Sequence, residues 1–235
     1  MKYLFFFLVP LFGLWGQSKI EHQSQVWYGY YLTYPFNQKW YVQGEVHKRH
    51  FVNPLEHHQY AFRAHVHRTM GETWDFSTGV AVFLNTPNNP LAPVRLVIPE
   101  YRPHADISYK HRWSMLRIEH RFRFEMRFNQ GTDVTKTNLT DEIKFSNYRF
   151  RYRLQALFPL VKSIQGKINT EILLNAAQDN PDNVLDQHRM FAGLSIPILS
   201  NLTVDVGYLH AFQQRSNLDF YDRSILSLMA YHRIK

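Results

Sequence analysis

The chain contains no cysteine among its 235 residues, so neither a disulfide nor a thiolate metal site contributes to its fold. It also has no apolar run of 18 or more residues, which excludes a helical membrane protein, and its mean hydropathy is −0.38. No G-x-S-x-G sequence is present to mark a nucleophile elbow. These absences do not exclude a transmembrane β-barrel, because alternating apolar and polar residues halve the hydropathy signal of each strand.

The first 17 residues differ in character from the rest of the chain. One charge, Lys2, precedes an apolar run that reaches Trp15 and stops at small and polar residues. This pattern predicts a secretory signal peptide over residues 1–17, cleaved near Gly16 or Gln17, because the run is too short for a comfortable membrane helix. An N-terminal anchor helix is the alternative. Residues 18–235 show no composition shift or linker, which predicts a single domain.

Residues 116–128 alternate strictly between charged and apolar side chains. Six charges share one parity, and apart from His120 the other parity is apolar. A period of two indicates an extended strand, since a helix would distribute both types around its circumference. The segment has 13 residues. An ordinary globular strand is shorter, whereas a tilted strand needs about 9–11 residues to cross the hydrocarbon of a bilayer.

The same alternation recurs along the chain. Further strands are expected near 39–50, 58–69, 74–84, 98–110, 147–158, 166–175, 187–196, 202–213 and 222–234. Short connections near 71–73, 111–113, 159–165 and 198–201 alternate with long ones near 51–57, 85–97, 129–143, 176–185 and 214–221. The pattern predicts an all-β fold, an antiparallel transmembrane β-barrel of about 10–12 strands.

Residues 23–34 complicate the strand count. They resemble another strand and would bring the total to eleven, whereas an antiparallel barrel with both ends in the periplasm needs an even number. Either this segment is partial, or it lies inside the barrel, or one strand has escaped detection.

A soluble barrel or sandwich would show the same alternation with the apolar rows turned inward. The length of the rows, the export signal and the aromatic residues near predicted strand ends favour the membrane. The net charge is +8, but the arginines alternate along strands instead of forming a patch, so nucleic acid is not an expected partner.

Several short motifs, taken together with their order and spacing along the chain, resemble those of a known family. They are the Arg117 to Phe128 row, Glu100-Tyr101-Arg102, Arg149-x-Arg151-x-Arg153, Trp27, Asn169-Thr170-Glu171-x-x-x-Asn175, Asp186-Gln187-His188-Arg189 and Gly207-Tyr208. Together they resemble the outer-membrane β-barrel family known as domain of unknown function 2490, common in Bacteroidota. The resemblance implies location in the cell outer membrane and a barrel architecture, but no activity. His188 departs from the family pattern, in which Asn is more usual.

If lipid contacts the apolar rows, the charged rows line the interior of a narrow barrel. We expect this lumen charge cluster to pair internally, to fix strand register and to block the lumen. Replacing Glu119 or Glu125 would then leave buried charge uncompensated. The predicted cluster comprises Glu45, Arg49, Arg63, Glu100, Arg102, Arg117, Glu119, Arg121, Arg123, Glu125, Arg127, Arg149, Arg151, Arg153, Glu171 and Arg189.

Two functional alternatives remain beside the structural one. The row Arg149, Arg151 and Arg153 has no acid on its own face, which favours a narrow pore selective for a small anionic solute. A lipid-modifying hydrolase at the outer rim would need a serine beside an oriented base, and His57, His58, His210 and Ser216 are the candidates. No catalytic residue is assigned, and outer-membrane lipid is the expected partner.

Metal binding has only weak support in the sequence. His65-x-His67 puts two imidazoles on one face, where His47 or His104 could approach them, but no sulfur or closing carboxylate completes a set. Residues 179–183 with Asp186 are rich in oxygen ligands for Ca²⁺, yet their Asn-Pro content indicates turn chemistry first. No metal and no cofactor is expected.

Overall fold

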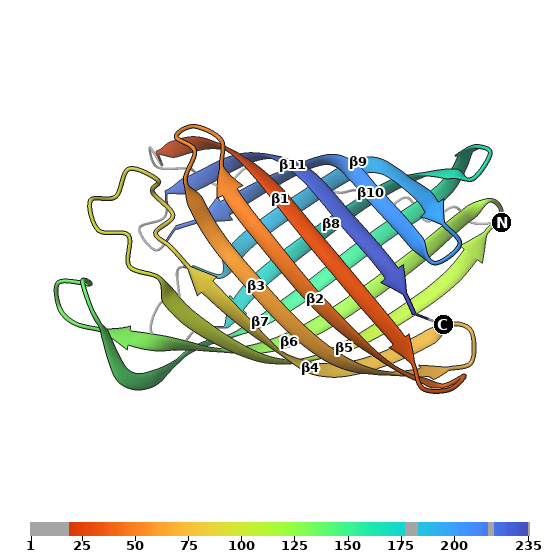
Figure 1. The fold of residues 1–235 in the computed structure, drawn as a ribbon, viewed down its shortest axis with the longest axis horizontal. Helices are drawn as coiled ribbons and strands as arrows, with labels where there is room; N and C mark the ends of the chain where they lie inside the picture. The colour runs from red at the N-terminus through yellow and green to blue at the C-terminus, as the bar shows by residue number, and fades with distance from the viewer. Residues whose placement is uncertain (1–18, 177–182, 216–218, 235) are drawn as a thin grey trace, which may run out of the picture.

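The computed structural model describes residues 19–176, 183–215 and 219–234, which form one closed barrel of tilted strands (Figure 1). The predicted signal peptide lies outside these residues. The strands are β1 (Ile20–Pro35), β2 (Trp40–Phe51), β3 (His57–Met70), β4 (Trp74–Asn85), β5 (Ile98–Trp113), β6 (Leu116–Thr132), β7 (Leu139–Val161), β8 (Ile164–Ala176), β9 (Leu185–Leu199), β10 (Leu202–Gln214) and β11 (Phe220–Arg233).

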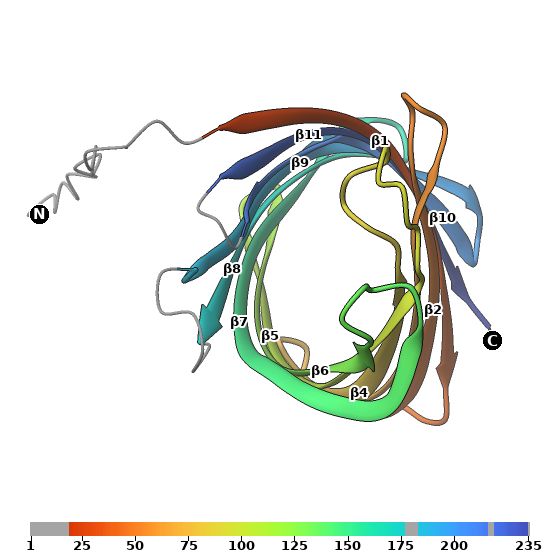
Figure 2. The same ribbon diagram turned by 90° about the vertical axis from the view of Figure 1, so that its left-hand side faces the viewer.

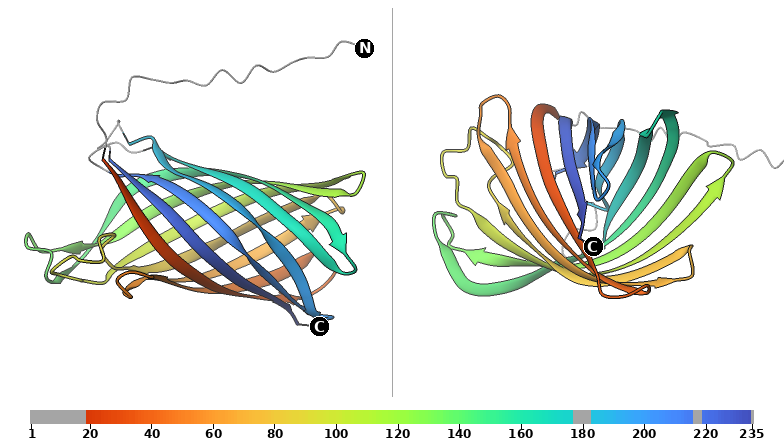
Figure 3. Two further views of the ribbon diagram at one scale, coloured as in Figure 1. Left: turned by 90° about the horizontal axis from the view of Figure 1, so that it is seen from above. Right: turned by 45° about the vertical axis from the view of Figure 1, so that its right-hand side comes forward.

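The barrel closes through a parallel pair of strands. Every consecutive pair is antiparallel, but β1 lies parallel to β11, with Ile20 opposite Phe220 and Trp27 opposite Ser227. Figure 3 shows these two strands side by side and pointing the same way. Residues 23–34 therefore belong to a complete wall strand, and the expectation of an even number was wrong. With an odd number, β1 begins at the opposite end of the barrel from where β11 ends.

The predicted strand positions are confirmed, with one large difference at the β6–β7 hairpin. Residues 129–143 were expected to form a loop, but β6 continues to Thr132 and β7 starts at Leu139. Register shifts at Arg127/Phe128 and Gln130/Thr132 let the ladder continue past the point where strict alternation ends. The expected turn at 111–113 is likewise the end of β5.

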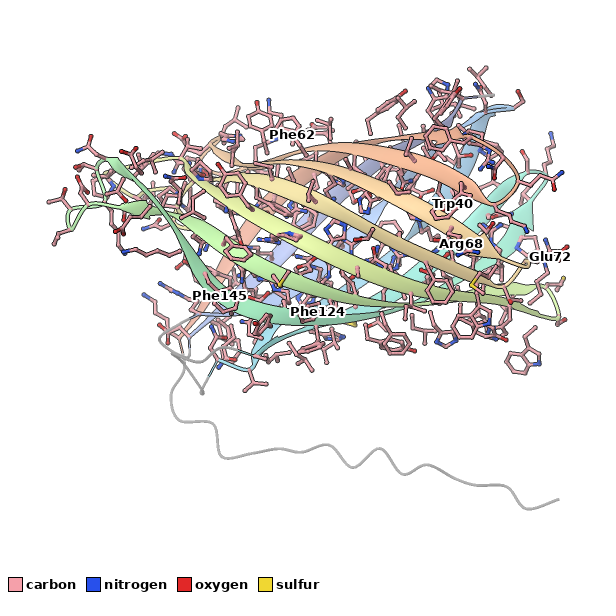
Figure 4. The ribbon with its side chains drawn as sticks, turned by 90° about the horizontal axis from the view of Figure 1, so that it is seen from below. Trp40, Phe62, Arg68, Glu72, Phe124 and Phe145 are labelled. Atoms are coloured by element: carbon pink, nitrogen blue, oxygen red, sulfur yellow. The ribbon has the colours of Figure 1, made fainter. Side chains whose placement is uncertain are left out.

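The barrel has an apolar outer surface and a charged interior. Phe122 and Phe150 are 58% and 51% exposed, whereas Arg123 and Arg151, each one residue further along the chain, are only 6% and 9% exposed. Figure 4 shows side chains over the outside of the barrel and labels Phe62, Phe124 and Phe145 among them. Among the described residues, no helix is long and apolar enough to cross a membrane.

The longest connections gather at one end of the barrel, here called the loop end, and the short turns lie at the other, the turn end. Viewed at the loop end in Figure 2, the connection of residues 86–97 folds inside the outline of the barrel. Its Asn88 reaches the opposite wall, where Gln23 Nε2 donates to the Asn88 carbonyl oxygen at 2.9 Å and Arg223 Nη2 donates to Asn88 Oδ1 at 3.0 Å. This connection therefore narrows the mouth.

Candidate functional site in the barrel interior

Two cavities of about 360 Å³ each occupy the interior. The turn-end cavity is lined by residues such as Tyr41, Asp75 and Lys167, and the loop-end cavity by residues such as His58, Asn88 and Arg223. Alternation along the strands puts these side chains inside, because successive residues face opposite sides of a sheet. Polar and charged side chains therefore line both cavities.

Five side chains border both cavities and so mark the junction between them, here called the partition: Trp27, Arg49, Arg63, Arg151 and Arg189. The guanidinium carbon of Arg49 lies 3.8 Å from the centre of the Trp27 ring, and that of Arg189 lies 5.4 Å from it. Arginine stacks on aromatic faces through cation–π attraction. Because Trp27 comes from β1 and Arg189 from β9, the partition joins walls that are not neighbours.

Glu171 on β8 is the centre of one ion-pair network. Its carboxylate accepts from Arg151 at 2.8 and 2.9 Å, from Arg121 at 2.7 Å and from Arg189 at 3.5 Å. These donors come from β7, β6 and β9, and Glu171 itself is 5% exposed. A buried carboxylate with three arginines ties four strands together, and slipping any of them by one residue would turn its charged row outward.

A second network surrounds Glu125 and Glu100. Arg151 donates to Glu125 at 2.8 Å, and Arg102, Arg123 and Arg149 lie 3.6–4.0 Å from the same carboxylate. Glu100, which is 2% exposed, accepts from Arg102 at 2.6 and 2.9 Å and also from Arg127. Arg123 in turn holds Asp106 at 2.5 and 2.9 Å, and Arg149 lies 3.0 Å from Asp186.

The turn-end cavity also contains clustered histidines. Arg63 donates to Glu45 at 2.5 Å, and the ring nitrogens of His47 and His65 lie 3.3 and 3.2 Å from the same carboxylate. His65 Nδ1 faces His104 Nε2 at 3.0 Å.

Among the described residues, His65, His104 and Asp106 have metal-ligating atoms within 4.8 Å of one another. A cation there would compete with Arg123 for both Asp106 oxygens. His67, the other member of the predicted pair, contacts Asp75 at 2.8 Å instead.

Charge is distributed unequally between the two cavities. Nine arginines and lysines and six carboxylates line the turn-end cavity. Eight arginines and a single carboxylate, Glu100, line the loop-end cavity. Glu100 is bound by two of these arginines, and four others pair with carboxylates outside the lining, so the excess positive charge of the loop-end cavity belongs to Arg49 and Arg223.

Fifteen of the sixteen residues of the predicted lumen cluster lie in the barrel interior, although they do not form one network. Arg153 and Glu119 form a separate pair at 2.7 Å, nearer the turn end and partly exposed. Arg49 bonds Gln59 at 2.6 Å and not a carboxylate. Arg117 is the exception, because it is exposed at the turn end of β6 beside Met115 and Phe158.

Sequence reasoning left several interior charges out of the cluster: Asp106, Lys167, Asp186, Asp205 and Arg223. Parity already indicated Asp106 and Lys167, which lie in phase with Glu100 and Glu171. Asp186 was grouped with a loop, but it lies in β9, and residues 179–182 of that loop are outside the described residues. Lys167 on β8 and Asp205 on β10 pair at 2.5 Å across β9, a contact that no local pattern reveals.

Of the candidate rim residues, His210 contacts a carboxylate, whereas the Nδ1 atoms of His57 and His58 are buried without a hydrogen-bond partner. His210 Nε2 lies 2.5 Å from Asp222 Oδ1, and His22 lies 3.2 Å from the other oxygen of this carboxylate. Ser224, opposite His210 in the β10–β11 ladder, contacts the Tyr208 hydroxyl at 2.9 Å. Ser216, the predicted serine, lies outside the described residues.

Comparisons with known proteins give a family but no activity. No curated protein matches the chain. Among solved structures, the NanC porin is similar, with 10% sequence identity and a TM-score of 0.49 over 84% of this chain and 90% of the porin chain. So low an identity and score transfer nothing about function. Residues 24–222 match the family described as "Protein of unknown function (DUF2490)". With most of its length matched, the chain belongs to this family of proteins of unknown function.

Proposed function

We propose that this protein is an integral outer-membrane β-barrel whose interior ion pairs hold its strands in register and close the lumen at the partition. One observation carries the proposal: burial is inverted relative to a soluble protein. Phenylalanines such as Phe122 and Phe150 are more than half exposed, while Arg123, Glu125 and Arg151 are at least nine-tenths buried. Lipid is the solvent that favours this arrangement, because water would expose the charges and bury the rings.

The ends of the barrel support the same proposal. At the turn end, Trp74 packs on Tyr109 with ring centres 4.8 Å apart, and the Arg68 guanidinium lies 5.4 Å from the Trp40 ring. Figure 4 labels Trp40 and Arg68 near that end, with Glu72 at the tip. Aromatic and basic side chains typically mark the boundary between hydrocarbon and headgroups. The signal peptide expected over residues 1–17 would supply the export that such a location needs.

Refolding tests membrane integration directly. The mature chain is refolded into detergent micelles and into phospholipid vesicles, and the products are compared by heat-modifiable gel migration and protease resistance. We expect a compact, protease-resistant form only when detergent or lipid is present. If the protein instead folds as a monodisperse species in plain buffer and does not bind to vesicles, the result would support a soluble barrel and overturn the proposal.

Conductance tests whether the lumen is closed. In planar bilayers, the purified protein should show no steady single-channel steps, because the partition separates the two cavities. Trp27→Ala removes the aromatic surface on which Arg49 lies and should produce measurable current. Steady current from the unaltered protein would contradict closure without contradicting membrane integration.

A second candidate function, a narrow anion pathway, is favoured by the excess of arginine at the loop end. Rings of arginine attract anions and repel cations. If the protein conducts, its reversal potential in a KCl gradient should show chloride preference, and cation preference would remove this candidate. No reaction is assigned to the barrel, because no hydrogen bond joins a serine to a histidine among the described residues, and Ser224 contacts the Tyr208 hydroxyl instead. Lipid A and phospholipid mass spectra of a deletion strain should be unchanged.

A further inference from the structure

Two buried arginines of the loop-end cavity contact no carboxylate among the described residues. We propose that Arg49 and Arg223 form a binding site for a small organic anion carrying a carboxylate or phosphate group. The site goes beyond the proposed structural role of the interior, because it assigns a ligand to charges that the ion-pair networks leave unneutralised. It requires a folded barrel but does not require an open lumen.

Arg223 on β11 is 4% exposed and surrounded by neutral oxygen acceptors. Its Nε donates to Gln23 Oε1 at 2.8 Å and its Nη2 to Asn88 Oδ1 at 3.0 Å, and Gln213 accepts from Nη1. These amides orient the guanidinium without cancelling its charge. A buried cation held only by neutral partners is costly unless a counter-ion joins it.

Arg49 on β2 is 8% exposed and has fewer hydrogen bonds than Arg223. Its Nη1 donates to Gln59 Oε1 at 2.6 Å, while its buried Nε has no hydrogen-bond partner. One face of the guanidinium is covered by Trp27 at 3.8 Å. The stacked Trp27 ring fixes the plane of the Arg49 guanidinium. The N–H groups along the edge of that guanidinium can then donate to two oxygens of one ligand.

Residues of the cavity itself supply no acid that could neutralise these two arginines. Glu100 is the only carboxylate in the lining, and Arg102 and Arg127 already bind it. Each of the other six arginines of the lining is paired with a carboxylate, so the unneutralised positive charge at the site belongs to Arg49 and Arg223. An anion entering from the loop end is therefore attracted before it makes any contact.

The surroundings also define the size and polarity of the ligand. A volume of about 360 Å³ suits a small molecule and lies at the low end for ligand pockets. Gln59, Gln187 and Gln213 line it beside the arginines and offer amide groups to hydroxyl or carbonyl oxygens. The side chains of the partition border the cavity below, and residues 86–97 narrow it above, which favours a small molecule over a polymer.

The connection over the mouth is firmly held where it meets the site. Arg95 donates to the His57 carbonyl of β3 at 2.6 Å, which joins the connection to that strand, and to the Pro90 carbonyl within the connection at 2.8 Å. The amide oxygen of its Asn88 accepts a hydrogen bond from Nη2 of Arg223. A ligand carboxylate or phosphate would replace that neutral oxygen with a charged one, a stronger acceptor.

Binding is measured by titrating the refolded full barrel in micelles with inorganic phosphate and with citrate, using calorimetry and intrinsic tryptophan fluorescence, to which Trp27 contributes. Glycerol serves as the uncharged probe. We expect saturable binding of at least one anion and none of glycerol. Arg49→Gln and Arg223→Gln should each weaken it about tenfold or more, because each removes charge-assisted hydrogen bonds. Arg117→Gln, the same change at the exposed turn end, should leave it unaltered.

Three outcomes would overturn the inference. They are no binding tighter than about 1 mM, equal loss in the Arg117→Gln control, or unchanged binding in both interior variants. If a Gln variant fails to fold, Arg49→Lys replaces it, since Lys keeps the charge but loses the fork and should also weaken binding. Heat-modifiable migration of every sample separates a missing anion site from failure of the barrel to form.

Discussion

Glu171→Gln tests the structural role of the interior most sharply. The substitution keeps the size of the side chain and removes its charge. Arg151 retains Glu125 as a partner, but Arg121 and Arg189 contact no other carboxylate among the described residues. Two buried guanidinium groups would therefore lose their only counter-charge.

The expected loss in the free energy of unfolding follows from this geometry. Breaking a fully buried ion pair costs about 3–5 kcal/mol, because the partner is left as an uncompensated charge. The side chains of Arg121 and Arg189 are 18% and 14% exposed to the cavity, so water can reach them in part. We therefore expect a loss of about 3 kcal/mol, at the lower end of that range.

Two matched variants calibrate the measurement. Glu119→Gln breaks one partly exposed pair with Arg153 and should cost about 1 kcal/mol or less. Glu142→Gln breaks a fully exposed pair with Lys144 and should have no measurable effect. Reversible urea unfolding in lipid vesicles, followed by tryptophan fluorescence and gel migration, gives the three values. If Glu171→Gln and Glu142→Gln coincide within error, the structural role is refuted.

Other perturbations address the outer face, the wall and a loop. Phe122→Arg should destabilise the vesicle-bound barrel by about 2–4 kcal/mol if this residue lies near the bilayer midplane, whereas Phe122→Leu should cost far less; equal unfolding midpoints would contradict lipid contact. Gly193→Val should block refolding on gels, since a Cβ there would lie 2.7 Å from the Cα of Gly207 on the neighbouring strand. In the loop after β6, hydrogen bonds from Asn138 and Thr137 lower the pKa of Asp133. The loop conformation that these hydrogen bonds hold should therefore persist at pH values where an ordinary aspartate is already protonated. It should be lost only as the pH falls through the lowered pKa of Asp133. An NMR titration that gives Asp133 an ordinary pKa would refute this.

The barrel and most of its interior were predictable because alternation is a local property. Once Phe122 and Phe124 are assigned to one face, Arg121, Arg123 and Glu125 must share the other. The same parity places Arg149, Arg151 and Glu171 inside. Alternation cannot distinguish lipid outside from water outside, so the orientation needed the export signal and the strand lengths as further arguments.

What the sequence could not reveal depends on contacts between distant strands. The pairing of Lys167 with Asp205 skips a strand, and Asn88 meets Arg223 from a loop on the opposite wall. Parity also cannot tell a paired arginine from an unpaired one, so Arg49 looked the same as Arg151. The parallel closure was missed because hairpin reasoning supplies only antiparallel neighbours.

The parallel β1–β11 closure changes how the two ends of the barrel can be joined or labelled. Fourteen paired residues from Ile20 to Thr33 run beside β11, and at about 3.3 Å per residue with a tilt of about 40° they separate the ends by roughly 30 Å along the barrel axis. A circular permutant would need a linker of roughly ten extended residues to connect them, where an even-stranded barrel needs only a turn. In a membrane, a label beside Ile20 and another beside Arg233 would face opposite compartments, so an impermeant reagent added on one side reaches only one of them.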